Sequence, residues 1–236
     1  MSLFYDLHIH SALSPCGDED MTPNNIVNMS VLKGLDVIAV TDHNSAANAR
    51  SCVECGKRAG ILVLPGIEIE TSEEVHLLAL FSTPDDAENM SSVICNKLPK
   101  IKNRVDIFGE QYVMDCDDNI VDIIPNLLST ATQISLNDAV KLVRELNGVA
   151  IPAHIDKSSY SIFSNLGFIP DELAFSTLEV KDKGKSVEVL SGYKTSDFKL
   201  ISNSDAHFLW DINERINSLD IGTPDYCKII DYLRQK

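Results

Sequence analysis

The chain has 236 residues, 44% of them hydrophobic, so it can bury a normal core and form one large domain or two small ones. Its formal net charge is −15, and a surface this acidic repels the nucleic-acid backbone, so we expect a small substrate or the end of a short chain and exclude duplex nucleic acid. The start of the chain lacks the basic segment of a secretory leader, no apolar run approaches the roughly 18 residues of a membrane-spanning helix, and the six cysteines fit free thiols, so we expect a cytoplasmic protein with no membrane partner.

Short apolar runs rich in β-branched residues recur along the chain, as expected for the buried strands of a parallel sheet. They lie at Leu3–Ile9, Leu35–Val40, Ile61–Leu64, Val75–Phe81, Val149–Ala153, Leu178–Val180 and Leu200–Ser202. Helical patterns lie between several of these runs, the first with Thr22 as N-cap and Pro23 at the first helical position. The expected helices cover 22–34, 45–60, 135–148 and a last segment that begins at Pro224. Strands that alternate with helices predict an α/β fold with a parallel sheet, either open or closed into a barrel.

The middle of the chain departs from this alternation. Residues 83–134 are acidic, irregular and weakly periodic, and they contain Pro84, Pro99 and Pro125. We predict that they form a small, partly helical insertion over one end of a barrel, within a single domain that covers 1–236.

Five of the six histidines stand at or just beyond the end of an apolar run, and His76 stands near the start of one. The other five are His8, His10, His43, His154 and His207. In α/β barrels, residues at the carboxyl ends of the strands converge at one face, so we expect these side chains to meet. A single strand-end histidine is more often a hydrogen-bonded core or surface residue, but scattered histidines would fall mainly in helices and loops.

Two carboxylates accompany the histidines: Asp205 lies two residues before His207, and Glu68 lies just past a strand. Because side chains alternate along an extended chain, His8 and His10 share one face, as do Asp205 and His207. Imidazole with carboxylate suits zinc, iron or manganese. Since the ligands exceed what one four-coordinate ion needs, the sequence predicts about two to three divalent ions.

Six short segments resemble the motifs of the PHP (polymerase and histidinol phosphatase) superfamily in their order and spacing. They are Asp6-Leu-His8-Ile-His10-Ser, Thr41-Asp-His43-Asn, Gly66-Ile-Glu68, Val75-His76-Leu-Leu, Ala153-His154 and Ser204-Asp205-Ala-His207. The resemblance implies a distorted (β/α)7 TIM-like barrel with a trinuclear metal site. It also implies how the ions are shared: one by His8, His10, Glu68 and Asp205, a second by Glu68, His76 and His154, and the third by His43 and His207.

The chain departs from the family pattern in two places. Many members carry an aspartate after the first motif that helps at the third ion; here the segment is Ser-Pro-Cys16-Gly-Asp18-Glu-Asp20, and we expect Asp18 as the substitute, with Asp20 and Cys16 as alternatives. Phosphatases of the family often follow the later histidine with proline and a basic residue, and here only the basic residue, Lys157, is kept. We expect Lys157 to bind the phosphate of the substrate, with a solvated surface lysine as the alternative.

Metal ions lower the pKa of bound water toward neutrality and neutralise phosphate charge. We therefore expect a metal-dependent phosphoric ester hydrolase that attacks a small phosphorylated substrate with a metal-activated hydroxide, with Glu68, Asp205 and Lys157 as catalytic residues. Candidate substrates are a nucleotide, a nucleoside bisphosphate, the end of a short oligonucleotide or histidinol phosphate. Asp6 and Asp42, each close to a ligand histidine, are expected either to orient imidazoles or to cap turns.

Two other classes of protein stay open at this point. An amidohydrolase that cleaves a C–N bond also uses His-x-His and a late aspartate, but it usually needs a strand-end lysine that bridges two metals, and Glu68 takes the bridging position here. A non-catalytic PHP module, of the kind attached to polymerases, can lose its metal ligands and serve structurally. Metal analysis distinguishes that module from an enzyme.

Overall fold

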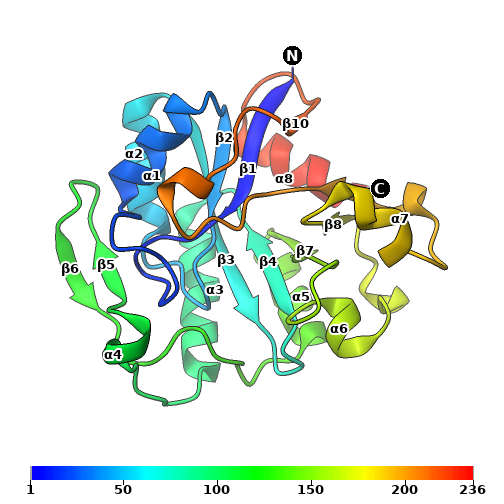
Figure 1. The fold of residues 1–236 in the computed structure, drawn as a ribbon, viewed down its shortest axis with the longest axis horizontal. Coiled ribbons are helices and arrows are strands. Elements are labelled where there is room, and N and C mark those ends of the chain that lie inside the picture. The colour runs from blue at the N-terminus through cyan, green and yellow to red at the C-terminus, as the bar shows by residue number, and fades with distance from the viewer. Residues whose placement is uncertain (1, 236) are drawn as a thin grey trace.

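The computed structural model describes residues 2–235 and is drawn as a ribbon in Figure 1. Its strands are β1 (Leu3–Ile9), β2 (Val37–Val40), β3 (Leu62–Glu70), β4 (His76–Leu80), β5 (Tyr112–Met114), β6 (Ile120–Ile123), β7 (Val149–Pro152), β8 (Thr177–Glu179), β9 (Lys199–Ile201) and β10 (Ser218–Leu219). Its α-helices are α1 (Pro23–Leu32), α2 (Ala49–Ala59), α3 (Pro84–Lys97), α4 (Val105–Phe108), α5 (Leu136–Glu145), α6 (Ile162–Leu166), α7 (Ser186–Val189) and α8 (Tyr226–Arg234). Short 3-10 helices cover Asp171–Leu173, Lys183–Lys185, Thr195–Asp197 and Leu209–Asp211. None of the helices within residues 2–235 is both long and apolar enough to cross a membrane.

Six strands form one hydrogen-bonded sheet in the order β10-β1-β2-β3-β4-β7, and β8 and β9 form a separate parallel pair. Two contacts draw this pair toward the larger sheet. Ile155, just after β7, donates its backbone N–H to the carbonyl of Glu179 in β8, and a parallel bridge joins Ile9 of β1 to Ala206 after β9. The result is a curled α/β sheet built from the predicted runs, with β10 added beside β1.

A regular barrel of seven parallel strand–helix units is not what the structure shows, because β4 is antiparallel to both of its neighbours, β3 and β7. Figure 1 shows the arrows of β3 and β4 pointing in opposite directions. Only residues 71–75 connect these two strands, whereas a parallel crossover needs about a dozen residues or more. The hairpin places the start of β4 at the edge where β3 ends, and His76 pairs there with Glu70.

The interior of the curled sheet is apolar and is closed by α8 at the amino end of the strands. Leu3, Tyr5 and Leu7 of β1 are buried in one cluster with Ile229 and Leu233 of α8. Figure 1 shows α8 near the N-terminal end of β1. Because apolar side chains fill this end, the carboxyl end of the strands is the one available to buried polar groups.

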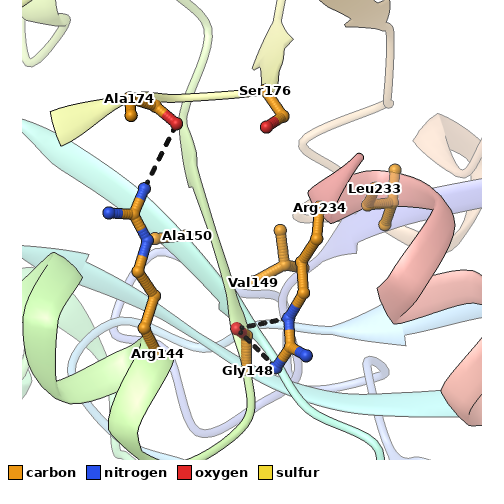
Figure 2. A pocket seen from close by; sticks show the side chains of 8 residues that line it. All are labelled: Arg144, Gly148, Val149, Ala150, Ala174, Ser176, Leu233 and Arg234. Atoms are coloured by element: carbon orange, nitrogen blue, oxygen red, sulfur yellow. Dashed lines mark hydrogen bonds between the residues drawn. The ribbon is translucent and has the colours of Figure 1, made fainter. Parts of the chain in front are cut away.

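Two arginines donate to backbone carbonyl groups that precede β7 and β8, as Figure 2 shows. Arg234 of α8 donates from Nε and Nη2 to the carbonyl oxygen of Gly148, at 3.1 and 3.0 Å, and Arg144 of α5 donates to the carbonyl oxygen of Ala174. Gly148 has no room for a side chain, because a Cβ there would lie 2.5 Å from the Phe81 ring. The cavity of about 370 Å³ at this place is lined by no histidine, cysteine or carboxylate residue, so it offers no metal-binding chemistry.

The N-caps predicted at Thr22 and Ser135 are confirmed, since each side chain accepts a backbone N–H from the first turn of its helix. Helix α2 begins later than predicted, at Ala49. Helix α8 also begins later, because Asp225 rather than Pro224 supplies its cap.

Residues 83–134 divide into two parts. Helix α3 packs against the sheet, with Ala87, Met90 and Ile94 fully buried among side chains of β4 and α5. The remainder contains α4 and the β5–β6 hairpin, which extends away from the sheet in Figure 1. Phe108 of α4 and Ser129 bring this part to the edge of the cavity described below.

Candidate metal centre

A bulge near the end of β1 turns His8, and His10 just after the strand, toward one point. The pairing of β1 with β2 shifts register between Asp6 and Ile9, and such a bulge re-aims side chains. Leu7 packs inside the sheet, whereas Ile9 packs outside it, beneath α1 and α2. His8 and His10 are fully buried, and their Nε2 atoms lie 3.2 Å apart.

The Glu68 carboxylate, on β3, is the centre of the cluster. Five imidazoles surround it: Oε1 lies 2.9 Å from His76 Nδ1, 3.2 Å from His154 Nε2 and 3.3 Å from His8 Nε2, and Oε2 lies 3.1 Å from His43 Nδ1 and 3.4 Å from His10 Nε2. These imidazoles come from the ends of β1 and β2, the start of β4 and the loop after β7. The fold therefore gathers residues that are far apart in the sequence around one carboxylate.

Asp205 and His207 reach the same point from the loop after β9. Asp205 Oδ1 lies 3.4 Å from the Nε2 atoms of both His8 and His10. The His207 ring stacks on the His10 ring, with centroids 4.3 Å apart. The structure thus brings together every predicted ligand except Asp18.

Two of these residues have strained backbones. His154 has a φ of 30° and Asp205 a φ of 55°, both in the left-handed region that side chains other than glycine rarely adopt. Strain of this kind persists where the surrounding structure enforces it, and it is concentrated at functional sites.

The structure places Cys16, not Asp18, beside the histidines. The Asp18 carboxylate accepts the backbone N–H of Asp20 at 3.0 Å and so closes its own turn. Cys16, His10, His43 and His207 each place one ligand atom within 4.8 Å of the others. The reason is the tight turn that ends at Gly17, which directs the preceding side chain toward the cluster.

Glu179 is a further member of the site that the sequence interpretation missed. Both of its carboxylate oxygens lie 3.1 Å from His8 Nδ1, and they also accept the backbone N–H of His154 and the amide of Asn203. The available clue was a carboxylate inside the apolar run Leu178–Val180, since a buried charge needs a partner.

Asp42 and Asp6 act at a greater distance from the cluster. Asp42 accepts hydrogen bonds from Ser11 and from the Ser14 hydroxyl at 2.6–2.7 Å, and Ser14 Oγ lies 3.0 Å from His10 Nδ1. Asp42 therefore orients His10 through Ser14. Asp6 instead accepts backbone N–H groups from the segment after β9 and holds it against β1.

The cluster is strongly charged. Burial alone would raise the pKa of Glu68, but the charges of His76, His8 and His43 hold it well below its ordinary value. For His10 and His43, burial alone would lower the pKa, but the neighbouring carboxylates outweigh burial and raise both pKa values to about 9. His76 is the opposite case, because burial dominates and lowers its pKa to about 4. Without bound cations, the site therefore holds protons on some imidazoles and lone pairs on others.

Two observations show that the donor set fits metal ions. Four ligands bound tetrahedrally at about 2.0–2.1 Å stand about 3.3–3.4 Å from one another, and the separations of 3.2–3.4 Å among His8, His10, Asp205 and Glu68 match this spacing. In addition, His43 Nδ1 and Glu68 Oε2 are buried and lie 3.1 Å apart, yet neither forms a hydrogen bond within the described chain. Buried polar atoms nearly always have a partner, and a cation would supply one.

A cavity of about 430 Å³ opens onto the cluster, and Lys157 and Tyr160 line it. Lys157 Nζ lies 2.5 Å from Asp205 Oδ2. Burial lowers the pKa of Lys157, but Asp205 outweighs it and the pKa is raised, so the ammonium stays charged at neutral pH. The Tyr160 ring stacks on His76, with centroids 4.9 Å apart, and 46% of the residue is exposed.

Comparison with known proteins identifies the family of this chain and two partial relatives. A family model described as the PHP domain matches residues 6–155. A 5′-3′ exoribonuclease of Haemophilus influenzae is 32% identical over 83 residues, and a phosphoribosyl 1,2-cyclic phosphate 1,2-diphosphodiesterase of Eggerthella lenta is 32% identical over 80 residues. These matches cover 34% and 32% of this chain, and only 29% of the length of each relative.

Solved structures share the fold at low sequence identity. A lesion-specific endonuclease from Pyrococcus furiosus superposes with a TM-score of 0.67 and 16% identity, over 99% of this chain and 56% of the other. A metal-dependent phosphoesterase, described as putative, from Bifidobacterium adolescentis superposes with a TM-score of 0.60 and 19% identity, over 96% and 94% of the two chains.

The exclusion of duplex nucleic acid is wrong. Endonuclease Q in complex with a 27-mer duplex substrate has the same fold, with a TM-score of 0.64, 17% identity and coverage of 99% of this chain and 56% of the other. The charge of −15 is a sum over the whole chain, whereas a phosphate responds to the local potential. At this cavity the local groups include the Lys157 ammonium and a donor set suited to cations.

Proposed function

Because this chain belongs to the PHP domain family, we propose that it is a metal-dependent phosphoesterase that hydrolyses phosphate esters of nucleotides or nucleic acids. The observation that carries the proposal is the Glu68 carboxylate, which has five imidazoles within 3.4 Å. Imidazole with carboxylate is a donor set for zinc, iron or manganese. The two relatives named for phosphoester cleavage support the class of reaction.

The proposed ligand sets are those that the resemblance to the PHP motifs implies. His8, His10, Glu68 and Asp205 hold one ion, Glu68 with His76 and His154 holds a second, and His43 and His207 belong to a third. When bound, such ions lower the pKa of water and neutralise the charge of a phosphate. The chain itself orients the ligands: Glu179 holds the Nδ1 side of His8, and Ser14 holds the Nδ1 side of His10, so both Nε2 atoms face the cluster.

Two side chains that line the cavity can bind the substrate. The Lys157 ammonium lies beside Asp205 and can bind a phosphate oxygen as a point charge. The exposed face of Tyr160 offers a surface on which a nucleobase can stack, because its other face rests on His76. These two groups favour a substrate that carries both a phosphate and a base.

The test is a phosphate-release and strand-cleavage screen. The panel contains nucleoside mono- and bisphosphates, histidinol phosphate, and 5′-labelled single-stranded and duplex oligonucleotides, each assayed with zinc, manganese or iron after chelator treatment. We expect at least one phosphoester to be cleaved only when metal is present, and we expect the purified chain to carry about two to three ions, as the donor set predicts.

Two results would overturn the proposal. A fully metallated chain that cleaves no phosphoester in the panel would argue for another reaction class. A chain that stays metal-free after reconstitution would argue for a structural module.

A further inference from the structure

Cys16 belongs to none of the histidine motifs, yet it lies at the site. Its Sγ is grouped with one nitrogen each of His10, His43 and His207, all within 4.8 Å of one another. The His10 Nε2 atom is already engaged elsewhere, at 3.4 Å from both Asp205 Oδ1 and Glu68 Oε2. His43 lies between the two groups, because its Nδ1 is 3.1 Å from Glu68 Oε2. Cys16, His43 and His207 remain as the donors that could hold an ion beside the Glu68 centre.

The loop that carries Cys16 is constructed to hold it there. Gly17 donates its N–H to the Ser14 carbonyl at 2.8 Å, which closes a turn with proline and Cys16 at its two central positions. Gly17 itself approaches the chain so closely that a Cβ would lie 2.4 Å from the Ser11 carbonyl oxygen. The next backbone N–H, that of Asp18, donates to the His207 carbonyl at 2.9 Å.

This last hydrogen bond joins the Cys16 loop to the loop after β9 and sets Cys16 beside His207. Ser14, at the start of the turn, also accepts the backbone N–H of His43 at 3.1 Å. The Cys16 turn is thus bonded to the backbones of both histidines in the set. These hydrogen bonds hold together the backbone segments that carry the three donors.

We propose that the Cys16 thiolate, with His43 and His207, binds the third ion and makes that position selective for zinc over manganese. The inference rests on the metal-dependent function proposed above, which it deepens by assigning a sulfur ligand. Thiolate is a soft donor that favours zinc, whereas manganese prefers carboxylate, carbonyl and water. Three protein ligands leave the fourth tetrahedral position open, as in catalytic zinc sites. Cys16 lines the same cavity as Lys157, so the open position faces the proposed substrate.

Cobalt substitution tests the sulfur ligand without reference to activity. Metal-free protein is loaded with cobalt(II), and the near-ultraviolet thiolate-to-cobalt charge-transfer band is recorded for wild type, Cys16→Ser and Cys16→Asp. Cys95→Ser is the matched control, because Cys95 is also an exposed free thiol but lies on α3. We expect the band in wild type and Cys95→Ser and its loss in both Cys16 variants. A band of equal strength in Cys16→Ser would overturn the proposal.

Metal competition tests the selectivity. Zinc binds more tightly than manganese to nitrogen, oxygen and sulfur ligands alike, so zinc is titrated against a large excess of manganese. We expect Cys16→Asp, in which a carboxylate restores a hard ligand, to need at least about tenfold more zinc than wild type and Cys95→Ser to displace manganese from the third position. Iodoacetamide labelling, followed by mass spectrometry, provides a third measure: zinc should protect Cys16 by at least about tenfold and leave Cys95 unprotected. Displacement of manganese at the same zinc concentration in wild type and Cys16→Asp, or labelling of Cys16 that zinc does not slow, would contradict the assignment.

The two proposals fail in different ways. A cobalt–thiolate band in a chain that cleaves no phosphoester would keep the sulfur ligand and remove the proposed reaction. Metal-dependent cleavage with unchanged cobalt spectra and metal content in Cys16→Ser would keep the reaction and remove the sulfur ligand.

Discussion

The imidazole Nδ1 of His8 lies 3.1 Å from both carboxylate oxygens of Glu179. Both residues are almost completely buried, and the ion pair holds the proton on the Nδ1 side of the ring. The Nε2 side of the His8 ring is consequently directed at Glu68 and Asp205, and it offers its lone pair once a metal ion has displaced the Nε2 proton. A carboxylate behind a histidine fixes the orientation of a metal ligand and raises its basicity.

The first prediction follows from this pair. Glu179→Gln keeps the size of the side chain but removes its charge, so it should lower metal affinity or turnover by about 10–100-fold, the usual effect of losing such a partner. Competition with a chromophoric chelator measures the affinity. Glu172→Gln, an exposed site on a 3-10 helix, is the matched control. Wild-type zinc affinity in Glu179→Gln would show that His8 is oriented by the backbone alone.

The second prediction concerns Glu68. Because its charge helps to hold the protons of His8, His10 and His43, Glu68→Gln should lower the pKa of these imidazoles and weaken the binding of more than one ion. We expect phosphoesterase activity to fall by more than about a hundredfold. Mutation of a residue that only hydrogen-bonds to a metal ligand already lowers metal affinity or activity by about 10–100-fold. Elemental analysis and circular dichroism check metal content and fold. Glu145→Gln on the exposed face of α5 is the control, and a Glu68→Gln protein with full metal content would remove Glu68 from the centre.

Sequence patterns were sufficient to locate most of the site because its ligands sit where strands end. His8 lies near the end of a buried run, His43 and His154 each follow one, and a parallel sheet gathers such positions at one edge. His76 fits this rule only through the β3–β4 hairpin, whose connection is too short for a parallel crossover.

The rest depends on loop geometry and on long-range contacts. Asp18 and Cys16 are two residues apart, and the choice between them is made by the turn at Gly17 and by the bond from Asp18 to His207, which no periodicity encodes. Glu179 lies 171 positions from His8. Nothing local to either residue indicates that they pair, apart from the cost of burying an isolated carboxylate.

The third prediction concerns protons. In metal-free protein, carboxylates raise the pKa of His8 well above its ordinary value and that of His10 and His43 to about 9, despite burial. These imidazoles are charged at pH 7.5, so bound metal must displace their protons. Zinc affinity should therefore rise as pH increases from about 6 to about 9, with the release of about two or more protons at pH 7.5. Calorimetry in buffers of different ionisation enthalpy counts the protons.

The same raised pKa values determine how the stability of the metal-free chain depends on pH. A histidine whose pKa is higher in the folded state stabilises the fold fully below its unfolded pKa of about 6.5 and loses that contribution as pH rises through the folded value. Metal-free protein should therefore become less stable to urea between about pH 7 and pH 9, as His10 and His43 lose their protons. Zinc affinity that is flat over this range, with no proton release, would contradict the charged cluster.

The last prediction separates substrate binding from metal binding at Lys157. Its ammonium lies 2.5 Å from Asp205 Oδ2 and lines the cavity, so it can contact a phosphate oxygen. Among the described residues that line the cavity, Lys157 is the one lysine. A charge-assisted contact is worth about 1.5–3 kcal/mol. Lys157→Ala should therefore lower kcat/KM for a phosphomonoester by about ten- to a hundred-fold. Lys157→Arg should recover part of the loss if charge is the main requirement.

Metal content decides what the Lys157 result means, because Asp205 is itself a proposed ligand. If the lysine serves the substrate, Lys157→Ala keeps its ions and Asp205 stays in place through the metal. If the ion pair instead holds Asp205 in position to bind metal, Lys157→Ala loses metal and activity together, and excess zinc restores turnover. Lys141→Ala, on the exposed face of α5, is the matched control and should behave as wild type in both assays. Full kcat/KM in Lys157→Ala would mean that the ions alone hold the phosphate, because no other lysine lines this cavity among the residues that the structure describes.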